Sequence, residues 1–363
     1  MEVYVLNTSF ETVKLIDDFI SLIWTDRYDE AGDFELHLAM DTDLLQYLKQ
    51  DYYLWNRESE HMMIIESVSI EPNVESGNKL KITGRSLESL LDRRIIWGQK
   101  ILSCPVYIGV KEILDDNFIN PRDSKRKVAN FIFDEDINDE RITSPDIRLE
   151  TQYDGESVYE VISSLCKENK IGFKITLNSK NQFVFKLYAG ADRTYRQTAN
   201  PYVIFSPKFD NLLNSSYLES KKDYKNVTLV GGEGEGSERK TKVVGDNNIS
   251  GLDRREIYTS AGGVSSNAYE GTLADNVYQT HLKQKGIKTL AEHLETIAFE
   301  GDLEPKLMYT YGVDYFIGDI VQLANEYGHE GYAYISELVM SHETSGVSMY
   351  PTFKTIQEGD LDT

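Results

Sequence analysis

The segment DFELHLAM, residues 33–40, decides the fold class, because its large apolar side chains recur at every second position. The side chains that would share one face of a strand are Phe34, Leu36, Leu38 and Met40. A period of two is typical of a β-strand with one buried face. Comparable patterns surround this segment from residue 1 to residue 98, so residues 1–98 are expected to form a small β-barrel or sandwich.

Residues 99–199 show a different pattern, which predicts an α+β module. Ser157 and Glu160 have the spacing of a helix capping box, and an apolar helical stripe follows them. Two alternating segments then flank Asn178–Asn181, whose residues favour a turn. This module should therefore contain a helix followed by a β-hairpin.

Strand patterns return in residues 200–235 and 303–355, which are expected to form a second β unit. The pattern in residues 236–302 predicts an insertion within that unit, with a helix near 274–300. Residues 356–363 are expected to form a polar tail. The expected fold class is therefore α+β and β-rich, with two β-barrel domains and inserted α+β domains.

The composition describes a packed, acidic protein. The 363 residues suggest two to four domains, and 40% hydrophobic with 27% charged residues is ordinary for globular chains. Against 60 Asp and Glu there are only 38 Lys and Arg, a net charge of −22. A nucleic-acid-binding face needs surplus cations, so sequence-specific nucleic-acid binding is not expected.

The chain ends and the cysteines also exclude several classes of protein. The start MEVYVLNTSF lacks the basic and apolar regions of a signal peptide, and no apolar run approaches the roughly 20 residues that span a bilayer. Stable membrane insertion is therefore not expected. Cys104 and Cys166 lack the spacing of a zinc or redox pair and predict two buried thiols.

The glycine-rich segment GGEGEG, residues 231–236, superficially resembles a dinucleotide-binding loop. Its glycines Gly232, Gly234 and Gly236 follow the pattern GxGxG, so the third glycine is not at the spacing that a dinucleotide-binding loop requires. Glu233 and Glu235 would also repel a phosphate. The pattern also lacks a helix directly after it. A flexible or bulged strand end is the favoured interpretation, and no cofactor is expected.

Two Ser-x-x-Lys patterns were considered as sites of a catalytic serine, Ser164 with Lys167 and Ser124 with Lys127. Neither is accompanied by the other sequence elements of penicillin-recognising enzymes. The six histidines form no metal-binding pair and are expected at surface or edge positions; they are His37, His61, His281, His293, His329 and His342.

The carboxylates and tyrosines give no stronger functional signal. Acids are too abundant for any carboxylate pair to indicate glycoside hydrolysis, and a Gly-Asp turn explains Asp314 and Asp319. The 23 tyrosines fit half-buried strand faces. We therefore expect no catalytic, cofactor-binding or metal-binding residue and predict that the protein is not an enzyme.

Five segments together resemble the hub proteins of long-tailed phage baseplates and tail tips. They are WTDRYDEAGDFELHL (24–38), MMIIESVSI (62–70), KLKITGRSLESLLDRRII (79–96), NVTLVGGEGEGSERK (226–240) and YFIGDIVQL (315–323). This family includes the N-terminal hub portion of tail-associated lysins and the central hub of T-even phages. The similarity spans nearly the whole chain.

The resemblance implies assembly as the function. Such hubs are similar in forming a homotrimeric ring, in which two tube-like β domains per subunit match the sixfold tail tube or distal tail ring on one side and the threefold tip on the other. Distal tail, tail tube, tape-measure and tip or fibre proteins would be the partners. The chain would then be assembled in the bacterial host cytoplasm into the virion tail, or into a related injection device.

Two further points follow from the same resemblance. Many tail-tip members continue into a lytic or receptor-binding domain, whereas this sequence stops at Thr363, so that activity is expected elsewhere. Acidic side chains lining the ring would let DNA pass without sticking; a solvated acidic surface is the plainer alternative. The competing functions are a host-wall carbohydrate-binding module, which needs exposed aromatic residues, and a wall hydrolase, which needs converging acid and base groups.

Overall fold

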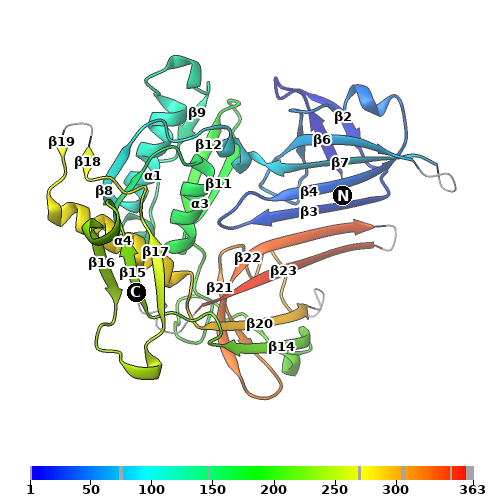
Figure 1. Ribbon diagram of the computed structural model, residues 1–363. Coiled ribbons are helices and arrows are strands. Elements are labelled where there is room, and N and C mark those ends of the chain that lie inside the picture. Colours follow the sequence, from blue (N-terminus) through cyan, green and yellow to red (C-terminus); the bar gives the residue numbers. More distant parts are fainter. Residues whose placement is uncertain are drawn as a thin grey trace.

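The structure is a computed structural model that describes residues 2–72, 77–145, 147–268, 271–303, 308–343 and 346–356. Beyond Ile356, the expected polar tail lies outside the described residues. The described chain is β-rich with several helices, and it confirms an α+β fold (Figure 1).

One large sheet organises the molecule, and strands from both ends of the chain build it. Its strands are β1 (Val3–Leu6), β2 (Thr12–Ile16), β3 (Ser21–Arg27), β4 (Asp33–Ala39), β5 (Tyr53–Trp55), β6 (Met63–Glu71), β7 (Lys79–Ser86), β13 (Ile204–Phe205), β21 (Ile320–Ala324), β22 (Glu330–Glu343) and β23 (Gly346–Ile356). The order is β13-β21-β22-β3-β4-β7-β6-β5-β1-β2, and β23 also pairs with β22. The expected strand at residues 33–40 is confirmed, with Phe34, Leu36 and Leu38 buried.

Two separate closed barrels are not formed by the described strand pairings, contrary to expectation. The N-terminal and C-terminal strands instead share one open sheet, joined where β22 pairs antiparallel with β3 and Val339 lies opposite Thr25. A strand has only two hydrogen-bonding edges, and β3 uses them for β4 and β22. Residues 1–98 therefore cannot close on β3, and the two β units lie side by side (Figure 1).

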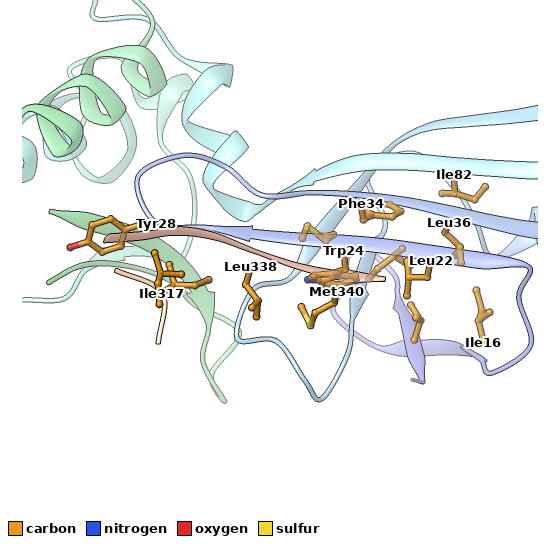
Figure 2. Packing of buried hydrophobic residues seen from close by; sticks show 14 of the residues in the cluster. Ile16, Leu22, Trp24, Tyr28, Phe34, Leu36, Ile82, Ile317, Leu338 and Met340 are labelled. Carbon is orange, nitrogen blue, oxygen red and sulfur yellow. The ribbon is translucent and has the colours of Figure 1, made fainter. Parts of the chain in front are cut away.

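The core of this sheet follows β3 along its length. Leu22 and Trp24 are fully buried, and Leu338 and Met340 of β22 lie beside them in the same cluster. Figure 2 shows these side chains in a row that continues to Tyr28, next to Ile317. Burial of such side chains stabilises a fold by roughly 1.5 to 3 kcal/mol each, so this row joins the two β units firmly.

The α+β module has its own core and two small sheets. Its elements are β8 (Lys100–Pro105), α1 (Val106–Leu114), a π-helical turn (Asp115–Ile119), β9 (Phe131–Phe133), α2 (Glu140–Thr143), β10 (Arg148–Tyr153), α3 (Val158–Glu168), β11 (Gly172–Leu177) and β12 (Phe183–Tyr188). The expected hairpin is confirmed as β11 and β12. Helix α3 begins after Ser157, but the capping box does not form, because the Ser157 hydroxyl donates to Asp92 at 3.1 Å.

The inserted segment contains a second layer of sheet and helix. Strands β15 (Val227–Gly231), β16 (Thr241–Gly245) and β17 (Glu256–Ser260) form a three-stranded sheet, and α4 (Asp275–Ala291) packs on it. The remaining strands are β14 (Leu212–Ser220), β18 (Asn267–Ala268), β19 (Gly271–Thr272) and β20 (Thr296–Leu303), and β14 pairs with β20. Along the whole described chain, the short 3-10 helices are η1 (Leu44–Gln46), η2 (Leu87–Arg93), η4 (Ser124–Arg126), η5 (Pro207–Phe209), η6 (Gly236–Glu238) and η7 (Gly251–Asp253).

Three expectations for this half of the chain were wrong or only partly testable. The helix near 274–300 stops at Ala291, because Thr296–Leu303 at the end of that range pair with β14 as strand β20 instead. Strand β15 pairs with β16 and β17 and therefore does not belong to the second β unit. Within the β unit expected at 303–355, residues 304–307 lie outside the described chain, and Tyr311 makes only an isolated bridge.

Tyr28, just beyond β3, connects the large sheet to the α+β module. Its N–H donates to the Ser336 carbonyl at 2.9 Å, its carbonyl accepts from the Phe173 N–H at 3.0 Å, and its hydroxyl donates to the Lys170 carbonyl at 3.0 Å. The ring lies against Gly172 and Gly318, where an added Cβ would come within 2.2 and 2.3 Å of it. Both glycines therefore leave the space that the ring fills.

This packing predicts that Gly172→Ala destabilises the protein, because the new methyl group would displace the Tyr28 ring from a filled site. We expect a loss of about 1 to 3 kcal/mol in the free energy of unfolding, measured by urea denaturation. Gly331→Ala is the matched control, since a Cβ there meets nothing within 4 Å, and it should change stability by less than about 0.5 kcal/mol. Equal effects of the two substitutions would contradict the role given to Tyr28.

Candidate functional site

The glycine-rich loop after β15 is tied down by protein groups. Glu233 accepts hydrogen bonds from the Ser266 hydroxyl at 2.5 Å, the Ser266 N–H at 2.8 Å and the Ser265 hydroxyl at 3.0 Å, and these bonds lower the pKa of its carboxyl group. The Tyr278 hydroxyl accepts from the Glu233 N–H at 2.8 Å, and a Cβ at Gly232 would collide with that hydroxyl. The loop is therefore anchored to α4 through the Glu233 N–H and to residues 265–266 through the Glu233 carboxylate.

The serine and lysine pairs are not brought together as catalytic dyads. Lys167 forms an ion pair with Glu30, and Ser164 donates to Glu168 at 2.8 Å. Lys288 of α4 contacts Ser164 and lies 2.8 Å from Glu168, so this group fastens α4 to α3. In the second pattern, the Lys127 N–H donates to the Ser124 carbonyl at 3.2 Å, a backbone bond of η4.

All six histidines were expected at surface or edge positions, and for two of them this expectation is wrong. His61 is 5% exposed and His281 is 2% exposed. Neither ring nitrogen of His281 has a hydrogen-bond partner, and burial lowers its pKa. The other four have local contacts: His37 pairs with Glu35, His293 bonds the Thr289 carbonyl, His329 stacks on Tyr217, and His342 lies against Phe19.

Asp314 and Asp319 both act in turns. Asp319 is buried; it accepts from the Ala191 N–H at 2.6 Å and the Phe316 N–H at 3.0 Å, and it pairs with Arg193 at 2.5 Å. Asp314 accepts from the Thr310 N–H at 2.7 Å. Asp319 therefore fixes the chain before β21 against residues 191–193 of the linker that leaves the α+β module.

A buried polar cluster at the end of β3 was not predicted. Asp26 accepts from the Trp24 indole at 2.9 Å and the Ser59 hydroxyl at 2.7 Å, and all three groups are buried. His61 Nδ1 lies 3.1 Å from Glu88, which also accepts from the Ile175 N–H of β11 at 2.7 Å. The cluster therefore connects β3, η2 and the α+β module. The sequence did contain a signal for the burial of Asp26, because Asp26 continues the alternation of buried positions at Leu22 and Trp24.

The charges of this cluster depend on one another. Burial alone would lower the pKa of His61, but the carboxylates of Glu88 and Asp26 raise it to about 9. Burial opposes the charge of Glu88, yet the charge and hydrogen bond of His61 hold its pKa below the ordinary range. Burial raises the pKa of Asp26. The His61 and Glu88 pair is thus ionised at neutral pH and stabilised only while both charges persist.

A cleft of about 560 Å³ opens beside this cluster, where the sheet, the α+β module and the turn before β21 meet. Its lining includes His61, Lys174, Tyr188, Arg193, Tyr311 and Asp319. Lys174 pairs with Glu60 and lies 4.9 Å from the Tyr188 ring centre, and Arg193 pairs with Asp319. Protein partners thus satisfy these charges, and the cleft acts as a junction between parts of the chain.

The part of the chain that the structure describes contains no group of three or more His, Cys, Asp or Glu side chains placed to hold a metal ion. None of its helices has the length and apolar character required to cross a bilayer. Cys104 and Cys166 are free thiols; Cys166 is buried as expected, whereas Cys104 is partly exposed.

The His61 and Glu88 pair predicts a specific pH dependence of stability. The folded-state pKa of His61 lies above its usual value of 6.5, so its contribution is complete below about pH 6.5 and is lost as the pH rises through about 9. The free energy of unfolding of the wild type should therefore fall over this range. In H61Q/E88Q this component should disappear, as measured by urea denaturation at pH 6, 7.5 and 9.

Single substitutions provide the comparison. Glu88 stays buried in H61Q without its charged partner, which should cost about 3 to 5 kcal/mol, more than the double variant. His37→Gln removes a histidine whose partner Glu35 is more exposed, and it should leave the pH dependence between 6.5 and 9 unchanged. An unaltered pH slope in H61Q/E88Q would show that the pair does not carry this stability.

Solved structures of phage tail proteins share this architecture over nearly its whole length. A tail protein from Neisseria meningitidis MC58 aligns with a TM-score of 0.57 and 13% identity, covering 98% of this chain and 96% of that chain. The 43 kDa tail protein of prophage MuSo2 from Shewanella oneidensis gives 0.56 and 14%, covering 100% of both. Prophage tail protein gp18 from Listeria monocytogenes EGD-e gives 0.53 and 11%, covering 93% and 90%.

The sequence itself gives a family assignment that agrees with this fold. A comparison with curated proteins found no match. The family model described as Siphovirus ReqiPepy6 Gp37-like protein matches residues 2–353, which is almost the entire chain. The resemblance to phage tail proteins is thereby confirmed, and the chain belongs to the Siphovirus ReqiPepy6 Gp37-like protein family.

Proposed function

We propose that this protein is the structural hub of a phage or prophage tail tip or baseplate. Three copies would form a ring that joins the sixfold tail tube or distal tail ring to the threefold tip. The family assignment and the tail-protein fold support a structural, non-enzymatic role in a tail. Distal tail or tube, tape-measure and tip or fibre proteins would be its neighbours in a virion tail assembled in the host cytoplasm.

The observation that carries this proposal is the union of two β units in one sheet. Residues 1–98 and the C-terminal strands lie side by side and are bonded through β3 and β22. Two β units per subunit would give six around a threefold ring, which is the number needed to face a sixfold tube. The tube-like wall would then arise from β units of neighbouring subunits.

The acidity of the chain suits such a passage. With a net charge of −22, a ring of three copies carries a large negative charge. Acidic side chains on the inner wall would repel the phosphates of passing DNA and keep it from adhering. We therefore propose DNA passage without sequence-specific binding.

The hub proposal predicts a mass of roughly three times 41.5 kDa in solution, measured by light scattering after size exclusion at several concentrations. Negative-stain images should show a ring with a central opening. In a phage or prophage that encodes this chain, deletion of its gene should leave tails without a tip. Intact, infectious tails after the deletion would contradict the proposal.

An exposed aromatic pair supports the second candidate, a wall-glycan-binding module. Tyr195 and Tyr202 are 51% and 42% exposed, and their ring centres lie 5.5 Å apart. Aromatic faces of this kind can pack on sugar rings. This candidate predicts that the purified chain binds peptidoglycan fragments in a pull-down and that Y195A/Y202A reduces binding at least tenfold. Absence of wild-type binding would reject it.

A further inference from the structure

A cationic patch stands out on this acidic chain. It lies where the segment after η2 meets the loop around η4, and we call it the basic patch. Its cations are Arg94, Arg122, Lys125, Arg126 and Lys127, and its aromatic centre is Trp97. Trp97 is 66% exposed, so a large apolar ring lies open to solvent among the positive charges.

Backbone and aromatic contacts hold the two central arginines together. Arg94 Nε donates to the Arg126 carbonyl at 3.3 Å, and Arg126 donates to the Ile95 carbonyl at 2.6 Å and to Asn117 at 2.8 Å. The Arg126 guanidinium lies 4.7 Å from the Trp97 ring centre. The side chains are therefore fixed in place before any partner binds, which lowers the entropy cost of binding.

The cations of the basic patch lack acidic partners. Over the described ranges, none of its five cations forms an ion pair, whereas the neighbouring Arg85 and Arg93 pair with Glu66 and Asp51. Partial burial and the nearby Arg94 lower the pKa of Arg126, and the carboxylate of Asp123 in the same loop opposes this shift only in part. Like charges held this close repel each other, and carboxylates from outside would relieve the repulsion. Trp and Arg are also the residues that most often dominate binding interfaces.

The densest acidic run of the chain lies close by in sequence. Residues 134–140, which read DEDINDE, contain five carboxylates in seven residues. Three of them, Asp134, Glu135 and Asp139, pair with lysines or an arginine of the same chain, which leaves Asp136 and Glu140 without a cation among the described residues. Strand β9 separates this acidic segment from the basic patch, and it pairs in parallel with β12. The patch thus precedes β9 and the acidic segment follows it, at opposite ends of the three-stranded sheet of β11, β12 and β9.

We propose that the basic patch of one copy docks on acidic segment 134–140 of the next copy. This inference rests on the proposed ring and names the contact that would close it. Contacts between two different surfaces run head to tail and generate a closed ring when the rotation is suitable. The partner is a second copy because its acidic segment offers Asp136 and Glu140, two exposed carboxylates that form no ion pair among the described residues and match the unpaired Lys125 and Lys127 in charge and number.

Charge reversal tests the contact on the full-length chain. Lys125 and Lys127 are exposed and form no ion pair among the described residues. Asp136 and Glu140 are also exposed, and no described Lys or Arg pairs with them. K125E/K127E alone and D136K/E140K alone should each raise the trimer dissociation constant at least tenfold in sedimentation equilibrium. The quadruple variant should restore it to within about threefold of wild type. Trp97→Ser should weaken the trimer in the same way.

Controls separate docking from folding and from general charge. K180E/K208E makes the same charge change at two exposed lysines outside the patch and should leave the trimer intact. Melting temperatures of the variants should match the wild type. A trimer that survives K125E/K127E, or one that the quadruple variant fails to restore, would overturn this inference alone. A monomeric wild type would overturn both it and the ring.

A nucleic-acid role for the patch is the remaining outcome. Binding of a 30-nucleotide single-stranded DNA to the wild type, with loss in K125E/K127E and no change in trimer mass, would overturn docking between copies. We expect no DNA binding at 0.15 M salt, because the chain as a whole repels a polyanion.

Discussion

The packing of the Tyr28 ring between Gly172 and Gly318 is the contact on which the arrangement of the molecule depends. Its backbone simultaneously bonds to β22 and β11, so one residue belongs to both β units and to the α+β module. The adjacent Asp29 extends this junction, because the Tyr334 hydroxyl donates to its carboxylate at 3.0 Å and the Ser163 hydroxyl donates to its carbonyl at 2.8 Å. The separate hydrophobic cores of the fold are thereby held together at Tyr28 and Asp29.

Charge reinforces the same junction. Buried ions are expensive to desolvate, and a cluster such as Asp26, His61 and Glu88 persists only when every member has partners. Here the partners come from β3, from η2 and from the β11 backbone, so the cluster is complete only when these parts are docked. Apolar packing brings the parts together, and the polar cluster favours one mutual orientation.

Local patterns predicted much of the secondary structure and little of its connectivity. The alternation at Phe34, Leu36 and Leu38 identified a buried strand, and the Asn178 turn identified the β11 and β12 hairpin, because both depend on neighbouring residues. The pairing of β3 with β22 joins residues about 310 positions apart, and no local pattern encodes it. The buried state of His61 depends likewise on Glu88 and Asp26, which reach it only through the tertiary fold.

The position of β3 between β4 and β22 also governs the order of folding during synthesis. Strand β4 leaves the ribosome directly after β3, whereas β22 ends at Glu343, near the end of the chain. Until then one edge of β3 has no partner, and Leu22 and Trp24 lack the side chains of β22 that bury them. Long-range pairing of this kind folds slowly and exposes a strand edge that can aggregate. The nascent chain thus depends on β22, which is made about 300 residues later, to protect β3.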